Sequence, residues 1–475
     1  MSESGADAVV DAATGGWRRA TGIVGLALGV VAAGAAAGVA VERLTVGREM
    51  RREARMVLDS AGPFGELRGT PGRAYADDGT ELYYEIDEID EIDGADGADG
   101  AVEIGGADGA GEPGAAEGAT SGAVTGAEGA HAPRGSRAAH DADGAEAADA
   151  AGAGADGGAA AGGGSAGGAR RPSGRRAPAP VTVVFCHGYC LNQDSWHFQR
   201  AALRGAVRGV YWDQRSHGRS GRGVTQGRDG EPVTIDGLGR DLRAVLDAAV
   251  PEGPVVLVGH SMGGMTVMAL ADQFPGFVRE RVAGVALVGT SSGRLGEVNF
   301  GLPVAGVNAV RRVLPGVLRA LGQRAELVER GRRATADLFA GIVKRYSFAG
   351  RDIDPAVARF AERMIESTPI DVVAEFYPAF DDHDKTAALA RFRELPVLVL
   401  AGVRDLVTPG GHSEAIAELL PGAELVMVPD AGHLVMLEHP ALVTDRLTGL
   451  IARARERARG DAAGPGDGGA RGPAG

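Results

Sequence analysis

A short apolar run that leads into a glycine–serine–glycine pentapeptide is the strongest constraint on how this chain folds. Residues 255–258 read Val-Val-Leu-Val, and residues 259–263 read Gly-His-Ser-Met-Gly. An apolar run of this length beside turn residues is typical of a buried strand. A serine flanked by glycines directly after it is typical of a sharp strand-to-helix turn, because a side chain at either glycine would collide with neighbouring backbone. The pattern predicts that the hydroxyl of Ser261 stands above the end of a strand.

Two later strand-like runs each lead into a residue that can assist a serine. Asp405 follows the run at 396–401, and His433 follows the run at 425–428. The carboxyl ends of parallel strands meet at one edge of a sheet, where ligands bind. A serine hydroxyl is a weak nucleophile that needs a base, and a carboxylate that orients the histidine makes it an effective one. The order Ser261, Asp405, His433 therefore predicts a nucleophile, an acid and a base at one edge.

These segments, with two others, resemble the α/β-hydrolase superfamily in its serine-hydrolase branch with a helical cap. The other two segments are His-Gly-Tyr at 187–189 and Asp-Gln-Arg-Ser-His-Gly-Arg-Ser at 213–220. The resemblance covers roughly residues 66–455 apart from one insertion. It implies an α/β fold, with a mostly parallel central sheet flanked by helices. It also implies a triad of Ser261, Asp405 and His433, and an oxyanion hole formed by the backbone N–H groups of Tyr189 and Met262.

Other residues compete for the two supporting roles. The competing carboxylates are Asp381, Asp382 and Asp430, and the competing histidines are His412 and His439. Asp430 is too near His433 in the sequence to come from a separate strand end, and Asp381 falls inside the expected cap. We expect His187 and His260 to be structural, and the segment 213–220 to make internal hydrogen bonds.

The segment 291–390 is expected to form the helical cap. Its apolar spacing predicts helices at 314–327 and 357–365, and its aromatic residues could line an apolar pocket. The expected substrate is a hydrophobic carboxylic ester, cleaved through an acyl-enzyme. The same triad could instead serve a carbon–carbon bond hydrolase, a thioesterase or a cofactor-free perhydrolase. A ligand-binding receptor with the same fold is the alternative to an enzyme.

Residues 87–180 form an acidic, Gly/Ala-rich insertion that opens with Glu-Ile-Asp repeats. The insertion carries 17 acidic residues and 6 arginines, which is −11 of the net charge of −14. It has too few large apolar residues to offset its ordering entropy, so we expect disorder. It follows a predicted hairpin at 73–86, with its turn at Asp78 and Gly79, and precedes a strand at 181–186. We expect it to join two adjacent strands of the sheet.

The two ends of the chain carry weaker signals. Residues 20–41 contain no charged residue and match the length of a bilayer core. Arginines after this stretch favour a single-pass anchor with the catalytic part in the cytoplasm, and the rival is a cleaved export signal. The expected organisation is a tail (1–19), an anchor (20–41), a juxtamembrane segment (42–65), core segments (66–86, 181–290 and 391–455) and a disordered tail (456–475).

The sequence offers no cofactor site. Metal-ligand spacings and phosphate-binding loops are absent, so we expect neither a metal nor a nucleotide. The acidic balance predicts no nucleic-acid binding, and the two cysteines, Cys186 and Cys190, are not expected to form a disulfide. The expected partners are a small hydrophobic ester and a membrane, and the oligomeric state stays open.

Overall fold

The computed structural model describes residues 64–90, 179–298, 312–313, 316, 336–350 and 352–463. The predicted tail, anchor and most of the juxtamembrane segment, the insertion from 91 to 178 and the last twelve residues lie outside these ranges. Among the helices of the described ranges, none combines the length and the apolar character that a membrane crossing requires.

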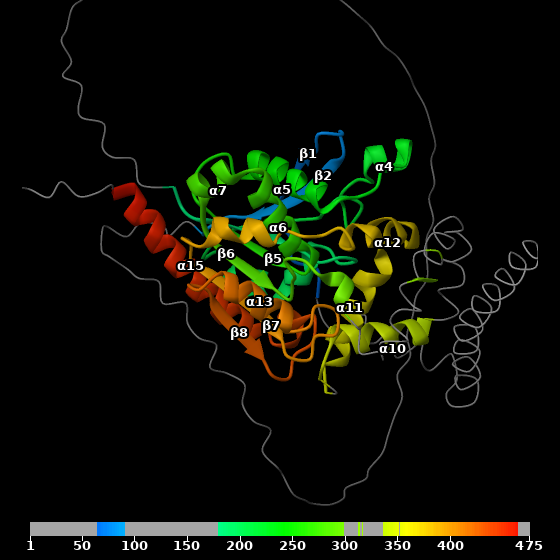
Figure 1. Cartoon of the computed structure of the whole chain (residues 1–475). Coiled ribbons are helices and arrows are strands. Elements are labelled where there is room, and N and C mark those ends of the chain that lie inside the picture. The colour runs from blue at the N-terminus through cyan, green and yellow to red at the C-terminus, as the bar shows by residue number, and fades with distance from the viewer. Residues whose placement is uncertain are drawn as a thin grey trace, which may run out of the picture. The chain divides into compact units, whose positions relative to one another are not determined.

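One eight-stranded sheet organises the described chain (Figure 1), in the order β1-β2-β4-β3-β5-β6-β7-β8. Its strands are β1 (Thr70–Tyr75), β2 (Glu81–Asp87), β3 (Thr182–Cys186), β4 (Arg208–Trp212), β5 (Val255–His260), β6 (Val282–Val288), β7 (Val397–Gly402) and β8 (Glu424–Val428). β2 is antiparallel to both of its neighbours, and the strands from β4 to β8 pair in parallel. The predicted mostly parallel sheet and the predicted hairpin at its edge are confirmed.

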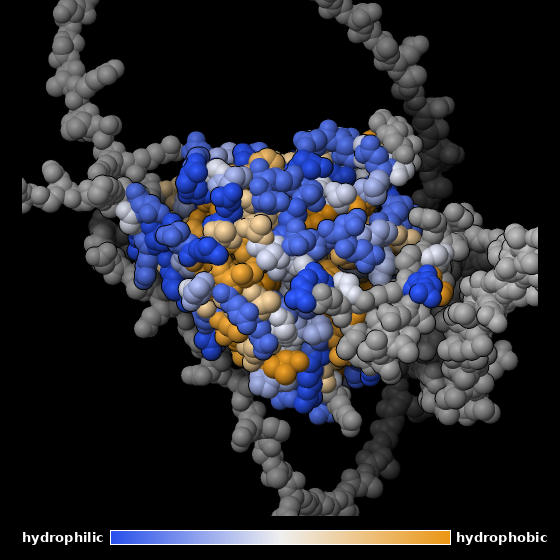
Figure 2. All heavy atoms as spheres, viewed as in Figure 1, coloured by the Kyte–Doolittle hydropathy of each residue, from blue (hydrophilic) through white to orange (hydrophobic). Residues whose placement is uncertain are grey.

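Helices cover both faces of the sheet, which explains why its central strands are buried and mostly apolar. Every residue of β3, β5, β6 and β7 is buried. One face packs against α5 (Ile235–Ala249), α6 (Met262–Gln273), α7 (Pro275–Arg281) and α13 (Gly411–Leu419). The other packs against α3 (His197–Leu203) and α15 (Pro440–Ala463). Hydrophilic side chains cover most of the outer surface of the described part in the view of Figure 2.

The remaining elements are short or lie beyond the ends of the strands. They are η1 (Gln193–Trp196), α4 (Val224–Asp229), η2 (Leu295–Glu297), α10 (Ala336–Ser347), α11 (Pro355–Ser367), α12 (Ile370–Phe376), η3 (Tyr377–Phe380), η4 (Thr386–Phe392) and α14 (Val435–Glu438). The expected helix at 357–365 lies within α11. Most of the expected helix at 314–327 lies outside the described residues. η4 contributes Leu389 and Phe392 to the core under α6, so the end of the expected cap belongs to the core.

The prediction that the insertion joins two adjacent strands was wrong. β4 lies between β2 and β3 and pairs with both. The insertion also begins later than position 87. Asp87 ends β2, and its carboxylate accepts two hydrogen bonds of 2.8 Å from Arg200, which is 2% exposed. A buried guanidinium needs carboxylate partners, so this pair holds the chain in the sheet.

The prediction of a disordered tail from residue 456 was also wrong at its start, because α15 continues to Ala463. Residues 453–463 are rich in alanine and arginine, which favour helix. Ala454 is fully buried against the sheet, and Ala458 packs beside it. The guanidinium of Arg455 donates to the carbonyl of Ala206, 3.1 Å away. Tertiary contacts therefore extend this helix past the predicted boundary.

Candidate active site

Ser261 stands on the sharp turn between β5 and α6 that its sequence predicts. Its φ of 52° lies in the left-handed region, which is rare for a residue with a side chain. A Cβ on Gly259 would lie 2.5 Å from the carbonyl oxygen of Gly263, and a Cβ on Gly263 would collide with the carbonyl of Cys186. Both glycines are therefore required for the close packing of β5, α6 and β3 at this turn.

A continuous chain of hydrogen bonds joins the three predicted residues. His433 Nε2 lies 3.0 Å from Ser261 Oγ, and His433 Nδ1 lies 2.8 Å from Asp405 Oδ2. The side chains come from the loops after β7 and β8 and from the turn after β5, all at one edge of the sheet. The structure thus brings together Ser261, Asp405 and His433 in an arrangement suited to proton transfer.

Thr408, which the sequence analysis did not single out, completes the environment of Asp405. Its hydroxyl donates to Asp405 Oδ2 at 2.8 Å, and its amide and that of Val407 donate to Oδ1 at 2.9 and 2.8 Å. Burial acts to raise the pKa of Asp405. The charge of His433 and the hydrogen bonds from His433 and Thr408 outweigh it and hold the pKa below its ordinary value. The carboxylate is therefore ionised and fixed toward the imidazole.

Two further side chains hold the backbone around His433. His260 Nε2 donates to the carbonyl of His433 at 3.0 Å. Glu438 accepts hydrogen bonds from the amides of Gly432 (2.7 Å), Ala349 (3.0 Å) and Gly350 (2.6 Å). Glu438 thereby ties the histidine loop to the turn between α10 and α11. Sequence reasoning had assigned only packing to His260 and no role to Glu438.

The loop that carries Tyr189 runs beside Ser261, and Met262 follows Ser261 directly. A Cβ on Gly188 would be 3.2 Å from Ser261 Cβ and 2.7 Å from His260 Nδ1, so the loop that carries Tyr189 runs close to the turn. Met262 is the first residue of α6, where amides lack intrahelical acceptors and the helix dipole is positive. Within the described ranges neither amide has a backbone or side-chain acceptor. Both are available to a negatively charged oxygen.

A largely apolar pocket of about 370 Å³ opens onto Ser261 and His433. Its lining includes Leu191, Met265, Leu295, Val343, Tyr346, Ile365, Tyr377, Phe380, Asp381, Val407 and Leu434. A volume of this size falls within the range of small-molecule sites. The pocket therefore has room for an apolar group next to the serine.

The competing residues lie elsewhere or have other partners. Asp430 pairs with Arg404 at 2.9 Å, and Asp381 lines the pocket without contacting His433. His412 Nδ1 lies 2.9 Å from Ser291 Oγ, and His439 Nε2 donates to the carbonyl of Asp430. Asp382 is exposed outside the pocket lining. The geometry therefore favours Asp405 and His433.

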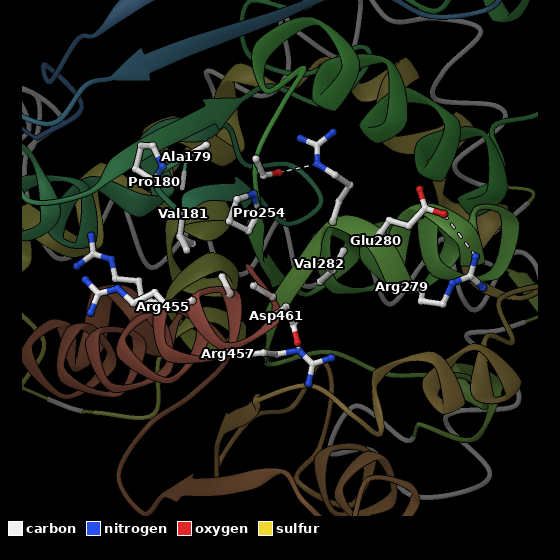
Figure 3. Close-up of a pocket in the computed structure, with 15 residues that line it drawn as sticks. Ala179, Pro180, Val181, Pro254, Arg279, Glu280, Val282, Arg455, Arg457 and Asp461 are labelled. Atoms are coloured by element: carbon white, nitrogen blue, oxygen red, sulfur yellow. Dashed lines mark hydrogen bonds and ion pairs between the residues drawn. The ribbon is translucent and has the colours of Figure 1, made fainter. Parts of the chain in front are cut away.

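A larger cavity of about 720 Å³ lies at the amino ends of β3 and β6 (Figure 3). Five arginines line it, together with Glu280 and Asp461; these are Arg279, Arg281, Arg455, Arg457 and Arg459. Its lining holds no serine, cysteine or histidine. Ser261 lies at the opposite, carboxyl end of β5, so this cavity is not the candidate site despite its size.

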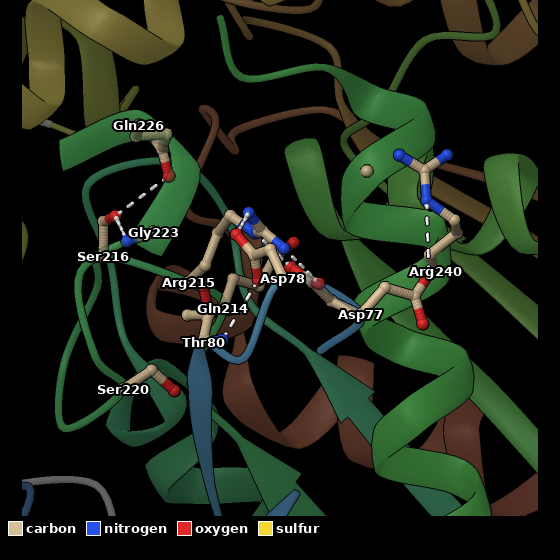
Figure 4. A network of polar contacts seen from close by, with 12 residues as sticks. Asp77, Asp78, Thr80, Gln214, Arg215, Ser216, Ser220, Gly223, Gln226 and Arg240 are labelled. Carbon is tan, nitrogen blue, oxygen red and sulfur yellow. Dashed lines mark hydrogen bonds and ion pairs between the residues drawn. The ribbon is translucent and has the colours of Figure 1, made fainter. Parts of the chain in front are cut away.

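The segment 213–220 makes the internal hydrogen bonds that we expected. Asp213 accepts from the amides of Gln193 (2.7 Å) and Arg219 (2.9 Å). Arg215 bridges the carboxylates of Asp241 and Asp78, as part of the polar network in Figure 4. Burial raises the pKa of Asp213 to about 7. These contacts fix loops around the site and take no part in the chain of hydrogen bonds at Ser261.

Three fully buried histidines surround the site and are held neutral. His187 and His217 each donate from Nδ1 to a carbonyl and accept a backbone N–H at Nε2, from Gln214 (2.9 Å) and Cys190 (3.2 Å). Burial lowers the pKa of His187 to about 3, that of His217 to about 4 and that of His260 to about 3. A second proton on His187 or His217 would break a backbone hydrogen bond.

Within the described ranges, no group of three or more His, Cys, Asp or Glu side chains is arranged to hold a metal ion. Cys186 is buried and Cys190 half-buried, and the two do not form a disulfide with each other. Burial raises the pKa of Cys186 to about 12, which removes it as a competing nucleophile.

A family profile described as "alpha/beta hydrolase fold" matches residues 181–440. This chain belongs to that family. The match spans more than half of this α/β-hydrolase and includes Ser261, Asp405 and His433.

Named relatives of this α/β-hydrolase differ in activity. A mouse sn-1-specific diacylglycerol lipase, ABHD11, is 29% identical over 280 residues, which cover 57% of this chain and 80% of the relative. The dihydrolipoyllysine-residue acetyltransferase component of an acetoin cleaving system from Pseudomonas putida is 26% identical over 273 residues. That match covers 57% of this chain and 63% of the relative, so the chain spans less than two thirds of that protein.

Solved structures that are similar to this chain include a thermophilic esterase from Thermogutta terrifontis. It is 25% identical, with a TM-score of 0.45, and the match covers 58% of this α/β-hydrolase and 92% of the esterase.

Proposed function

We propose that this α/β-hydrolase is a serine hydrolase that cleaves hydrophobic carboxylic esters through an acyl-enzyme. The observation that carries the proposal is the chain of hydrogen bonds from Asp405 through His433 to Ser261, which ends in an apolar pocket. A hydroxyl, a base and an ionised carboxylate in this order are the groups that acyl transfer requires.

The reaction proceeds in two halves. His433 Nε2 accepts the proton of Ser261 as Oγ attacks the ester carbonyl, and the imidazolium then protonates the departing alkoxide. Asp405 stabilises the imidazolium and fixes its tautomer. A water molecule, deprotonated by His433, next attacks the acyl-enzyme and releases the acid. The amides of Tyr189 and Met262 stabilise the oxyanion in both halves, and removing one such donor typically costs about 3–4 kcal/mol.

The pocket supports a small to medium hydrophobic substrate. Its lining is mostly aliphatic and aromatic, and within the described lining Asp381 is the only Asp, Glu, Lys or Arg. The lipase among the relatives is named for its action on diacylglycerol, which is also a carboxylic ester. The same triad can act on thioesters, carbon–carbon bonds or peroxide, so the electrophile is the part of the proposal that most needs a test.

The test combines covalent labelling with a substrate series. A fluorophosphonate probe should label Ser261 stoichiometrically, and p-nitrophenyl esters of increasing acyl length should show a maximum in kcat/KM. Ser261→Ala should lose both signals, whereas Ser292→Ala, which alters a buried serine outside the pocket lining, should keep them. Labelling without ester turnover would refute the ester assignment and point to another electrophile. A folded protein that is not labelled would refute the serine mechanism.

A further inference from the structure

The side chain of Tyr189 joins the loop at the candidate oxyanion hole to helix α12. Its hydroxyl donates to the carbonyl oxygen of Val373, in α12, at 2.5 Å. Its ring stacks on Phe376 with a centroid distance of 6.2 Å and meets Phe380 edge-on at 5.1 Å. The residue proposed to supply an oxyanion amide is therefore also the residue that contacts this helix.

The next residue of the loop is linked to the same helix. The amide of Cys190 donates to His217 Nε2 at 3.2 Å, and the ring of His217 meets Phe376 edge-on at 4.8 Å. Cys190 has a φ of 59°, in the left-handed region, so its backbone position depends on the contacts that hold it. Tyr189 thus contacts Phe376 of α12 directly, and Cys190 is linked to it through His217.

α12 also packs into an apolar cluster, in which Val372 and Phe376 lie with residues of α5 and α6, and it is bound by polar residues outside the pocket lining. Arg222 lies 3.1 Å from Asp371 and also pairs with Glu375, and Gln226 donates to Glu375 at 3.2 Å. The Arg222 side chain is 35% exposed, so its ion pairs are partly screened by solvent and are individually weak. α12 is therefore held by its apolar packing, by the loop that carries Tyr189 and by weak ion pairs on its polar side.

The chain directly after α12 lines the substrate pocket. Tyr377 and Phe380, in η3, both face the cavity that opens onto Ser261. A substrate group that fills this part of the pocket contacts residues that continue from α12. The substrate and the loop that carries Tyr189 therefore both contact α12 or the residues that directly follow it.

We infer that the Tyr189 side chain is a positioning group, which sets the oxyanion amide by tying it to α12. The inference rests on the proposed ester hydrolysis. It predicts that occupancy of the pocket beside Tyr377 and Phe380 improves the placement of the Tyr189 amide. Esters that reach these residues gain in kcat, not only in KM, because the gain is made in the transition state.

Tyr189→Phe is the direct test, since it removes the hydroxyl and keeps the ring. It should lower kcat about tenfold on the best acyl length and leave KM within twofold. This loss is smaller than that for removing an oxyanion donor, because the amide remains. Short esters that do not reach Tyr377 should lose less. The pH dependence of kcat should not change, because Asp405 and His433 are untouched.

A matched pair of ligands separates positioning from general damage. A trifluoromethyl ketone forms a tetrahedral oxyanion with Ser261, whereas the methyl ketone of the same chain length binds without it. Tyr189→Phe should weaken the trifluoromethyl ketone about tenfold and leave the methyl ketone unchanged. Tyr83→Phe is the matched control, since it loses a hydroxyl hydrogen bond of 2.9 Å, to Glu85, outside the pocket lining.

Arg222→Gln removes the ion pairs of α12 from outside the pocket and should show a loss with the same selectivity as Tyr189→Phe, but a smaller one, because these pairs are weak. It also serves if Tyr189→Phe folds poorly. Equal weakening of both ketones, or no weakening of either, would overturn the positioning role. A wild-type protein that neither turns over esters nor binds the trifluoromethyl ketone would instead overturn the proposed function on which the inference rests.

Discussion

Acidification below about pH 6.5 should destabilise this protein, because His187, His217 and His260 are buried and neutral. Their folded pKa values lie near 3, 4 and 3, below an unfolded value of about 6.5. As the pH falls below about 6.5, these histidines bind protons in the unfolded chain but stay neutral in the folded chain. The stability from these residues is therefore present above pH 6.5 and is lost on acidification toward their folded pKa values.

The size of the effect follows from the shifts. Between pH 7.5 and pH 5, each histidine lowers the free energy of unfolding by about 2 kcal/mol, or about 6 kcal/mol for the three. Asp213 acts in the opposite direction, since its folded pKa near 7 lies above its unfolded value. It contributes stability on acidification, about 3 kcal/mol over the same range. The expected net loss from these four groups is about 3 kcal/mol, a large part of the stability of a typical domain.

Urea unfolding at several pH values measures this loss, with the fluorescence of the buried Trp196 and Trp212 as the signal. His217→Gln should reduce the pH dependence by about 2 kcal/mol, because the amide oxygen can still accept the Cys190 N–H without titrating. Asp213→Asn should steepen it. His439→Gln, at a histidine that is only partly buried, is the control. A free energy of unfolding that is flat between pH 7.5 and pH 5 in the wild type would refute the reasoning.

Three substitutions test the site itself. Asp405→Asn should lower kcat by about 10⁴, the loss seen when the aspartate of a serine-protease triad becomes asparagine, because the amide favours the wrong imidazole tautomer. A variant that stays active in the ester assay would exclude Asp405 as the acid. Gly188→Ala places a Cβ 2.7 Å from His260 Nδ1 and should cost about 1–3 kcal/mol of stability and slow fluorophosphonate labelling; a melting temperature and labelling rate equal to wild type would contradict that packing. Glu438→Gln replaces a charged acceptor of three amides and should cost about 1–3 kcal/mol in urea unfolding, and unchanged stability would show that this tie is not structural.

The strands and the serine turn could be predicted from the sequence because their signals are local. Residues 255–263 specify a strand, a turn and the start of a helix within nine positions, and the structure has each of them there. The order of motifs also placed Asp405 and His433 at strand ends. Which carboxylate assists His433 could not be predicted from the sequence. The structure shows that Asp405 contacts His433, whereas Asp430 pairs with Arg404.

The predicted boundaries of the insertion and of the C-terminal tail were wrong because they depend on contacts between distant parts of the chain. Asp87 looked like part of an acidic repeat, because its partner Arg200 lies 113 residues later. The tail after residue 455 looked disordered because the carbonyl of Ala206, which holds Arg455, is 249 residues earlier. Thr408 and the hydroxyl of Tyr189 carry no motif of their own. Their roles depend on which loops the sheet brings together.

The point where the long insertion leaves the sheet has a consequence for how this protein can change over time. Asp87 pairs with Gly209 and Thr182 with Arg208, so the described chain departs and returns at the amino edge of the parallel strands. Ser261 and its partners occupy the carboxyl edge. Mutations that lengthen, shorten or replace residues 91–178 begin and end a full strand length away from the reacting groups. The two junctions, at residues 90 and 179, are therefore natural places to graft a foreign domain, because they lie away from the edge of the sheet that holds Ser261.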